Sequence, residues 1–135
     1  MGVASGTAVR EWPTWRVVLG PDARCAQAAR RYVVHALEDQ GWPQERCDIA
    51  GLVTSEILTN AIRHAAGPPA VTVALMDDHV RVTVEDHSPA AVPVMQGGVS
   101  WSDGGRGLRI VDALATGWGF ATADSVKQVW FELDL

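Results

Sequence analysis

Residues 55–65 read SEILTNAIRHA. The apolar residues of this stretch recur at helical spacing, yet Glu56, Asn60 and His64 stand four positions apart among them. Residues four apart lie one above the next on one side of a helix, so these three form a polar row beside the row that must be buried. A carboxylate beside a core is costly unless a basic side chain, backbone donors or a ligand satisfies it. The row either ties the helix to nearby loops or contacts a ligand, and the residues alone leave both interpretations open.

The surrounding pattern predicts a helix that contains this stretch in its second half. Pro43 suits the first turn of a helix, and Gly67, with the two prolines after it, ends the pattern. The apolar stripe of this helix is expected to consist of Ile49, Leu52, Val53, Ile57 and Ala61.

An earlier strand and helix are expected before Pro43. Residues 14–20 (TWRVVLG) alternate like a half-buried strand, and residues 23–40 show apolar residues at helical spacing, with Asp22 as the predicted N-cap. The arginines of this helix are expected on its outer side: Arg24, Arg30 and Arg31. Residues 1–13 lack any pattern and are expected to form a flexible N-terminus, which leaves residues 14–135 as a single domain.

Two alternating segments follow the central helix. AVTVALM (70–76) and HVRVTVED (79–86) are separated by two turn-prone aspartates, which predicts a β-hairpin. Because side chains alternate along a strand, Asp86 falls on the same inward face as the valines of its strand, at the strand's end. Asp86 either forms a turn with Ser88 and Pro89 or contacts a ligand.

Residues 87–104 have no periodicity, and a loop of this length inside a compact domain is usually functional or disordered. A helix is then predicted over residues 105–115, preceded by the glycine pair 104–105. Glycines just before a helix let backbone N–H groups approach a phosphate, and Arg106 could add a positive charge.

The chain ends in two strand-like runs around a turn at residues 123–125. In the last run Val129, Phe131, Leu133 and Leu135 alternate. The whole order is strand, helix, helix, hairpin, loop, helix, hairpin. It predicts an α+β fold, a two-layer sandwich with helices on one face of a mostly antiparallel sheet.

Charge and composition exclude several classes of function. The net charge is −5 and no basic cluster occurs, which argues against direct binding of nucleic acid. No apolar run is long enough for a membrane helix, so a cytoplasmic protein is expected. Cys25 and Cys47 are expected to be reduced thiols, and the histidines and cysteines lack the spacing of a transition-metal site.

Four segments together resemble the Bergerat-fold (GHKL) ATPases, the group of gyrase, Hsp90, histidine kinases and MutL. They are SEILTNAIRHA, VEDHSP (84–89), GGRGLRIVDAL (104–114) and KQVWFEL (127–133). The resemblance covers about residues 21–133 and is closest to the small bacterial anti-sigma factor serine/threonine kinases and their stand-alone ATP-binding relatives.

The resemblance implies ATP and Mg²⁺ as ligands. By their place in the motifs, Asn60 would ligate Mg²⁺, and Glu56 would be the general base that takes a proton from a serine hydroxyl or water. Asp86 would accept a hydrogen bond from the adenine amino group. The wider family has glycines where this chain has Ser88 and Ala90, so the contact beside the adenine is expected to differ.

The resemblance also implies a phosphate-binding turn. Gly105 and Gly107 would wrap the phosphates, with Arg106 and Leu108 beside them. His64 and its neighbour Arg63 would have supporting roles near the site.

The function implied is an ATP-dependent protein-serine kinase. It would phosphorylate a STAS-type anti-sigma factor antagonist and bind a sigma factor, switching between these partners, and two copies of the chain would pair as a homodimer. A non-catalytic nucleotide-binding or interaction module of the same fold is the alternative. A histidine-kinase catalytic fragment fits less well, because no phosphoacceptor helix and no long lid are found in the sequence.

Overall fold

The computed structural model describes residues 13–20, 22, 24–64, 67–87, 105–123 and 126–135, with the backbone alone at residues 61–64, 105–108 and 123. Its elements, in chain order, are β2 (Thr14–Val18), α1 (Cys25–Asp39), α2 (Gln44–His64), β3 (Ala70–Leu75), β4 (His79–Asp86), α3 (Gly105–Leu114), β5 (Gly117–Ala123) and β6 (Val126–Asp134). Each strand and helix expected from the pattern is present, with ends that agree with the prediction or differ from it by at most two residues.

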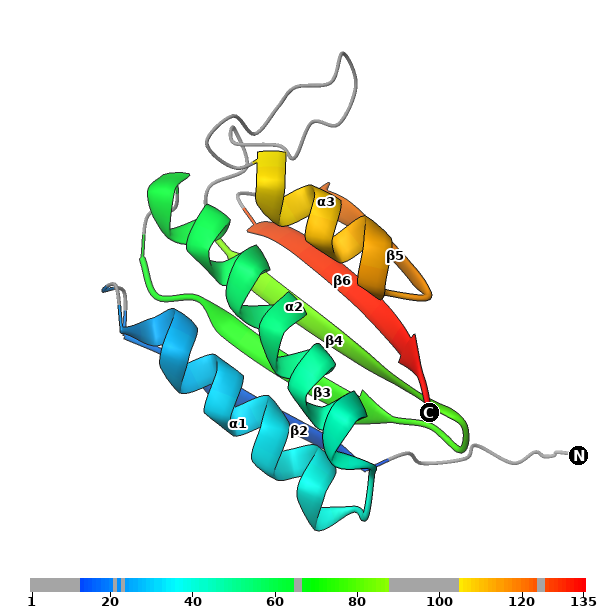
Figure 1. Cartoon of the computed structure of the whole chain (residues 1–135). Coiled ribbons are helices and arrows are strands. Elements are labelled where there is room, and N and C mark those ends of the chain that lie inside the picture. The colour runs from blue at the N-terminus through cyan, green and yellow to red at the C-terminus, as the bar shows by residue number, and fades with distance from the viewer. Residues whose placement is uncertain (1–12, 21, 23, 65–66, 88–104, 124–125) are drawn as a thin grey trace, which may run out of the picture.

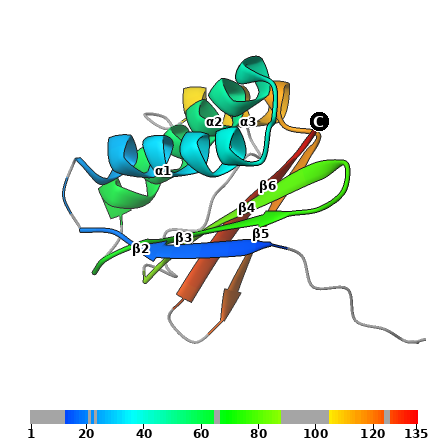
Figure 2. The ribbon, with the colours of Figure 1, turned by 90° about the horizontal axis from the view of Figure 1, so that it is seen from below.

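The elements form two layers. The strands make one sheet in the order β2-β3-β4-β6-β5, and every neighbouring pair is antiparallel. Figure 2 shows all three helices on the same face of this sheet. The predicted α+β sandwich is therefore confirmed.

The core lies between the layers, where the inward side chains of the strands meet the helices. The inner positions of β4, Val80, Val82 and Val84, are at most 1% exposed, and Phe131 of β6 is fully buried. From the helices, Leu37 and Leu58 complete the same cluster. Burial of side chains of this size stabilises a fold by about 1.5–3 kcal/mol each.

Helices α1 and α2 approach one another closely at Gly51. A Cβ added to Gly51 would lie 2.7 Å from Val34 Cγ2 and 3.0 Å from Arg30 Cγ. A larger residue at this position would force the Val34 side chain to shift, so the glycine lets the two helices pack this closely.

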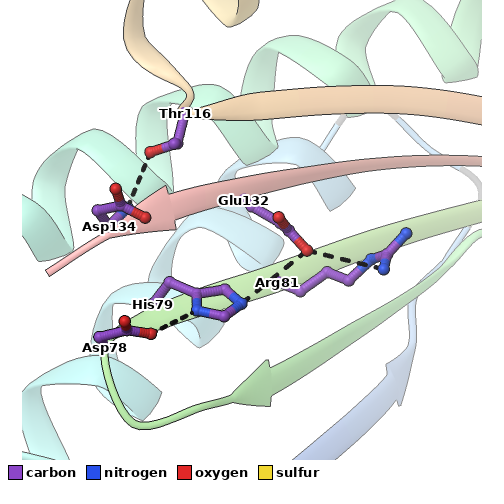
Figure 3. Close-up of polar contacts among 6 residues, drawn as sticks. All are labelled: Asp78, His79, Arg81, Thr116, Glu132 and Asp134. Atoms are coloured by element: carbon purple, nitrogen blue, oxygen red, sulfur yellow. Dashed lines mark hydrogen bonds and ion pairs between the residues drawn. The ribbon is translucent and has the colours of Figure 1, made fainter.

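Polar contacts link neighbouring strands at the end of the sheet where β4 begins and β6 ends. Figure 3 shows the residues involved: Asp78, His79, Arg81, Thr116, Glu132 and Asp134. The Nδ1 atom of His79 lies 2.8 Å from Asp78 Oδ1, and Arg81 Nη1 lies 3.7 Å from Glu132 Oε2. Because β4 starts at His79 and ends at Asp86, this cluster and Asp86 lie at opposite ends of the sheet.

Two local predictions are wrong. Asp22 is not the N-cap, because α1 begins at Cys25 with Arg24 as its N-cap. The Asp22 carboxylate instead accepts a hydrogen bond from the Arg24 backbone N–H at 2.8 Å, an Asx-type turn just before the helix. Leu135 does not continue the inward alternation, because β6 ends one residue earlier and Leu135 is 55% exposed.

The arginines of α1 are exposed as predicted, and Cys25 and Cys47 are buried free thiols. None of the helices in the described part of the chain is long and apolar enough to cross a membrane. The predictions for residues 1–12 and 88–104, Ser88 and Ala90 included, lie outside the described residues.

Candidate functional site

The polar row of α2 begins with two partly buried side chains, Glu56 and Asn60. The Asn60 Nδ2 atom donates a hydrogen bond to the backbone carbonyl of Glu56 at 3.2 Å. This bond uses the nitrogen end of the amide and leaves Oδ1 as the end that can bind a cation. The side chains of Arg63 and His64, one turn further along, are outside the description, and only their helical backbone is placed.

The carboxylate of Glu56 forms no hydrogen bond or ion pair with any residue in the described ranges. A partly buried acid normally has a partner, so this absence is unusual. The interpretation in which Glu56 ties the helix to a nearby loop finds no contact within those ranges to support it.

Asp86 is the last residue of β4 and is 1% exposed. It lies on the inward face, as the alternation of side chains along the strand predicts. Its cross-strand neighbour on β6 is Lys127, which is 4% exposed. The Nζ atom of Lys127 lies 3.4 Å from Asp86 Oδ2, so the two side chains form a buried ion pair. Both charged groups are therefore shielded from solvent at the end of the strand.

Lys127 was not among the residues that the sequence singled out. The sequence does indicate that Lys127 lies on the inward face of β6, because it alternates in step with the inward residues Val129, Phe131 and Leu133. The alternation of β6 therefore predicts an inward Lys127, although it does not show that this residue pairs with Asp86.

The glycine turn opens α3, whose first residue is Gly105, as the predicted helix over residues 105–115 has it. Gly105 and Gly107 lie within its first turn, and Arg106 and Leu108 share that backbone. The first N–H groups of a helix have no partner inside the helix. A glycine-rich first turn can therefore itself present N–H donors to a phosphate, with the helix dipole favouring an anion.

These parts meet at one end of the molecule. In Figure 1 the end of α2, the end of β4 and the starts of β6 and α3 all lie at the end opposite the C-terminus. Helix α2 packs against both β4 and α3. Gly67, which follows α2 and has a φ of 89°, lies beside the residue after Asp86, because a Cβ there would be 3.6 Å from His87 Nδ1.

The donors present fit a nucleotide with Mg²⁺. Within the described ranges no group of three His, Cys, Asp or Glu side chains could hold a metal ion. Mg²⁺, however, commonly takes one or two protein oxygens and completes its shell with water and substrate phosphates, so Asn60 Oδ1 can suffice. The first turn of α3 can present backbone N–H groups to an anion, and the carboxylate of Asp86 is of the kind that can accept a hydrogen bond.

Known proteins of several kinds are similar to this chain. An uncharacterized protein of Streptomyces coelicolor, SCO4941, is 39% identical over 69 residues, which are 48% of this chain and 66% of the relative.

Solved structures share the fold at low identity. The RsbU and RsbW domains of Rv1364c from Mycobacterium tuberculosis superpose with a TM-score of 0.69 and 18% identity, over 90% of this chain and 32% of that one. The histidine kinase domain of a blue-light activated histidine kinase from Erythrobacter litoralis gives a TM-score of 0.50 and 20% identity, over 98% and 68% of the two chains. The chain thus spans about a third of the mycobacterial structure.

A family model for the histidine kinase-like ATPase domain matches residues 20–132. This range takes in all three helices together with the strand positions of Asp86 and Lys127. The chain therefore belongs to the histidine kinase-like ATPase domain family.

Proposed function

We propose that this chain binds Mg-ATP and transfers the γ-phosphoryl group to a serine of a partner protein, as an anti-sigma-type serine kinase. Residues 14–135 would act as one ATP-binding unit. The observation that carries the proposal is the Glu56 carboxylate. It is partly buried, forms no hydrogen bond or ion pair with the described residues, and lies one helical turn from Asn60 in an ATPase-family fold.

Each side chain has a defined task in this reaction. Asn60 Oδ1 would hold Mg²⁺, which would supply neutralisation of the phosphate charge when bound. The first turn of α3, with Gly105 and Gly107, donates backbone N–H groups to the phosphates. Asp86 accepts a hydrogen bond from the base.

Glu56 acts on the attacking group. Its carboxylate accepts the proton of the substrate serine hydroxyl while that oxygen bonds to the γ-phosphorus. The bond between the γ-phosphorus and the bridging oxygen breaks, and ADP leaves with that oxygen. Phosphoryl transfer of this kind depends mostly on positioning and on charge neutralisation, which suits a site with few catalytic groups.

The partners proposed are a STAS-type antagonist, which carries the serine, and a sigma factor, bound in the other state of the switch. The exposed arginines of α1, Arg24, Arg30 and Arg31, offer a basic surface for an acidic protein partner. Pairing of two copies of the chain belongs to the same proposal, and sedimentation of the purified protein tests it.

The test is a phosphotransfer assay with a matched variant. Purified chain is incubated with Mg-ATP labelled on the γ-phosphate and a panel of STAS-domain antagonists, and the labelled residue is identified by mass spectrometry. Wild type should label a serine. Glu56→Gln, which keeps the shape of the side chain, should bind ATP as before and lose most of the transfer. A Glu56→Gln protein that labels at the wild-type rate refutes the assignment of the base.

The non-catalytic module is the second candidate. The replacement of the family's glycines by Ser88 and Ala90, and the lysine placed beside Asp86, favour it. It predicts that the wild type binds ATP but labels no antagonist in the panel, with complex formation as its output.

A further inference from the structure

Strand β5 lies at one edge of the sheet, and in the described part of the chain it pairs with β6 alone. Figure 1 shows β5 at the margin of the sheet away from β2. We propose that this edge is an interface between two copies of the chain, in which β5 of each copy pairs antiparallel with β5 of the other. The inference rests on the proposed function only in that both include a pairing of two copies, and it requires neither ATP nor phosphoryl transfer.

The edge of β5 lacks the features that normally keep an edge strand from pairing. Residues 117–123 read GWGFATA, seven residues without a charged side chain or a proline. Natural edge strands are usually short or carry charges, prolines or bulges, because their free N–H and C=O groups are a template for another strand. The opposite edge, β2, has these features, with five residues and the exposed Arg16 at its centre. Of the two edges, β5 is therefore the one suited to strand addition.

Phe120 identifies the face of this edge that a second chain would cover. It lies directly across from Val129 of β6, which is 7% exposed, so Phe120 points to the face on which the helices pack. Phe120 itself is nevertheless 43% exposed. The other large apolar side chains that are exposed in the described residues do not share this face, because Val18 alternates with the inward Val17 and Leu135 follows the end of β6. The core is thus left open beside β5.

The strand is complementary to a second copy of itself. Phe120 is the central residue of β5, with three strand residues on either side. When two identical strands pair antiparallel about a two-fold axis at their centres, Phe120 faces its own copy and Trp118 faces the Thr122 of the second copy. Aromatic pairs across strands are stabilising contacts, and here each Phe120 would cover the other. On the opposite face Gly119 would meet Ala121, so no large side chain obstructs the pairing.

Helix α3 carries charges that are complementary across the same axis. Arg109 and Asp112 are exposed and lie three residues apart, which places them on one side of the helix. The Trp118 Nε1 atom donates a hydrogen bond to Asp112 Oδ1 at 3.2 Å, so this side of α3 lies next to β5. A two-fold axis turns the second α3 antiparallel to the first, and Arg109 of each copy can then face the Asp112 of the other. This pattern favours a second copy over a partner of a single charge sign.

The dimer is expected to be weak. Pairing of one short strand with a few side chains buries less than the roughly 1,200–2,000 Å² of a stable protein interface. We therefore expect a dissociation constant on the order of 10 μM.

The experiment is sedimentation velocity of the purified full chain, without nucleotide, from about 1 to 300 μM, a range that brackets this constant. Wild type should pass from monomer to dimer. Phe120→Lys places two like charges at the axis and should weaken the dimer roughly tenfold or more. The control is Val18→Lys, which makes the same kind of change at an exposed apolar side chain on the other edge strand and should dimerise like wild type.

The two charges of α3 give a second test. Arg109→Asp should weaken the dimer, because it places like charges opposite one another, and the added change Asp112→Arg should restore most of the affinity by exchanging the signs. Amide hydrogen exchange on wild type needs no variant. Residues 117–123 should exchange more slowly at the high end of the concentration range than at the low end.

Three results would overturn the inference. They are a wild type that stays monomeric throughout, a dimer that Phe120→Lys leaves intact, and a dimer whose formation does not slow exchange at residues 117–123. Each of them leaves ATP binding and phosphotransfer to be judged by their own assays. A chain that dimerises through β5 but transfers no phosphate would overturn the proposed kinase activity alone.

Discussion

Breaking the ion pair between Asp86 and Lys127 from one side should destabilise the fold strongly. Their side chains are 1% and 5% exposed, so a Lys127→Met substitution leaves a carboxylate where almost no water reaches it. Loss of one partner of a buried pair costs about 3–5 kcal/mol. A domain of this kind has a free energy of unfolding of about 5–15 kcal/mol, so the variant should fold with a much reduced margin.

Removing both charges should have a much smaller effect. In the double variant Asp86→Val, Lys127→Met no buried charge remains, and apolar side chains fill a similar volume. Its free energy of unfolding is expected within about 1 kcal/mol of wild type, or above it. A double variant that is more stable than either single variant yet binds ATP poorly would mark the pair as functional.

Urea denaturation followed by circular dichroism and tryptophan fluorescence measures both effects. With a slope of about 2 kcal/mol per molar urea, the Lys127→Met midpoint should fall by roughly 1.5–2.5 M. Gln128→Met is the control and should lose only about 1 kcal/mol, for its hydrogen bond to Glu85. The reasoning is refuted if Lys127→Met lies within about 1 kcal/mol of wild type, because the pair would then not be buried and coupled.

Three further predictions concern other parts of the molecule. Gly51→Ala should lower the free energy of unfolding, measured in urea, by about 1 kcal/mol, because overpacking against Val34 at 2.7 Å exceeds the gain in helix propensity. An unchanged midpoint of urea unfolding would contradict the close helix contact. The hydrogen bond that Gln128 donates to Glu85, together with the contacts from Arg16, lowers the pKa of Glu85 from its ordinary value of 4.5. The ionised Glu85 therefore stabilises the fold at pH values above 4.5, and this stabilisation is lost as the pH falls through the lower pKa of the folded state. Wild type should be more stable than Glu85→Gln near pH 7 and should approach it as the solution is acidified; a difference that stays constant with pH contradicts this. Burial raises the pKa of the Cys25 and Cys47 thiols, so both should react slowly with a disulfide reagent at neutral pH until urea unfolds the protein. Rapid labelling of the native protein would count against their burial.

The sequence predicted the elements well where the hydrophobic period was long and regular. The alternation of β4 placed Asp86 on the inward face, because one residue of slippage would expose every valine of the strand. The helical period of α2 likewise placed Glu56 and Asn60 beside the core, where both are partly buried.

Contacts between distant segments could not be predicted in the same way. The pair of Asp86 with Lys127 depends on β4 and β6 being neighbours in the sheet, which no local pattern states. That the Glu56 carboxylate forms no hydrogen bond or ion pair within the described ranges also depends on the tertiary structure. The start of α1 was misplaced at Asp22, because a side chain that accepts from nearby backbone N–H groups suits a turn and an N-cap equally.

The most direct test of the account is a calorimetric titration of ATP into the wild type, with and without Mg²⁺, and into Asn60→Ala. The account predicts saturable, magnesium-dependent binding to wild type that is strongly weakened in Asn60→Ala, since Asn60 Oδ1 is the proposed ligand of the cation. Absence of binding to wild type at millimolar Mg-ATP, or equal binding to both proteins, would contradict it.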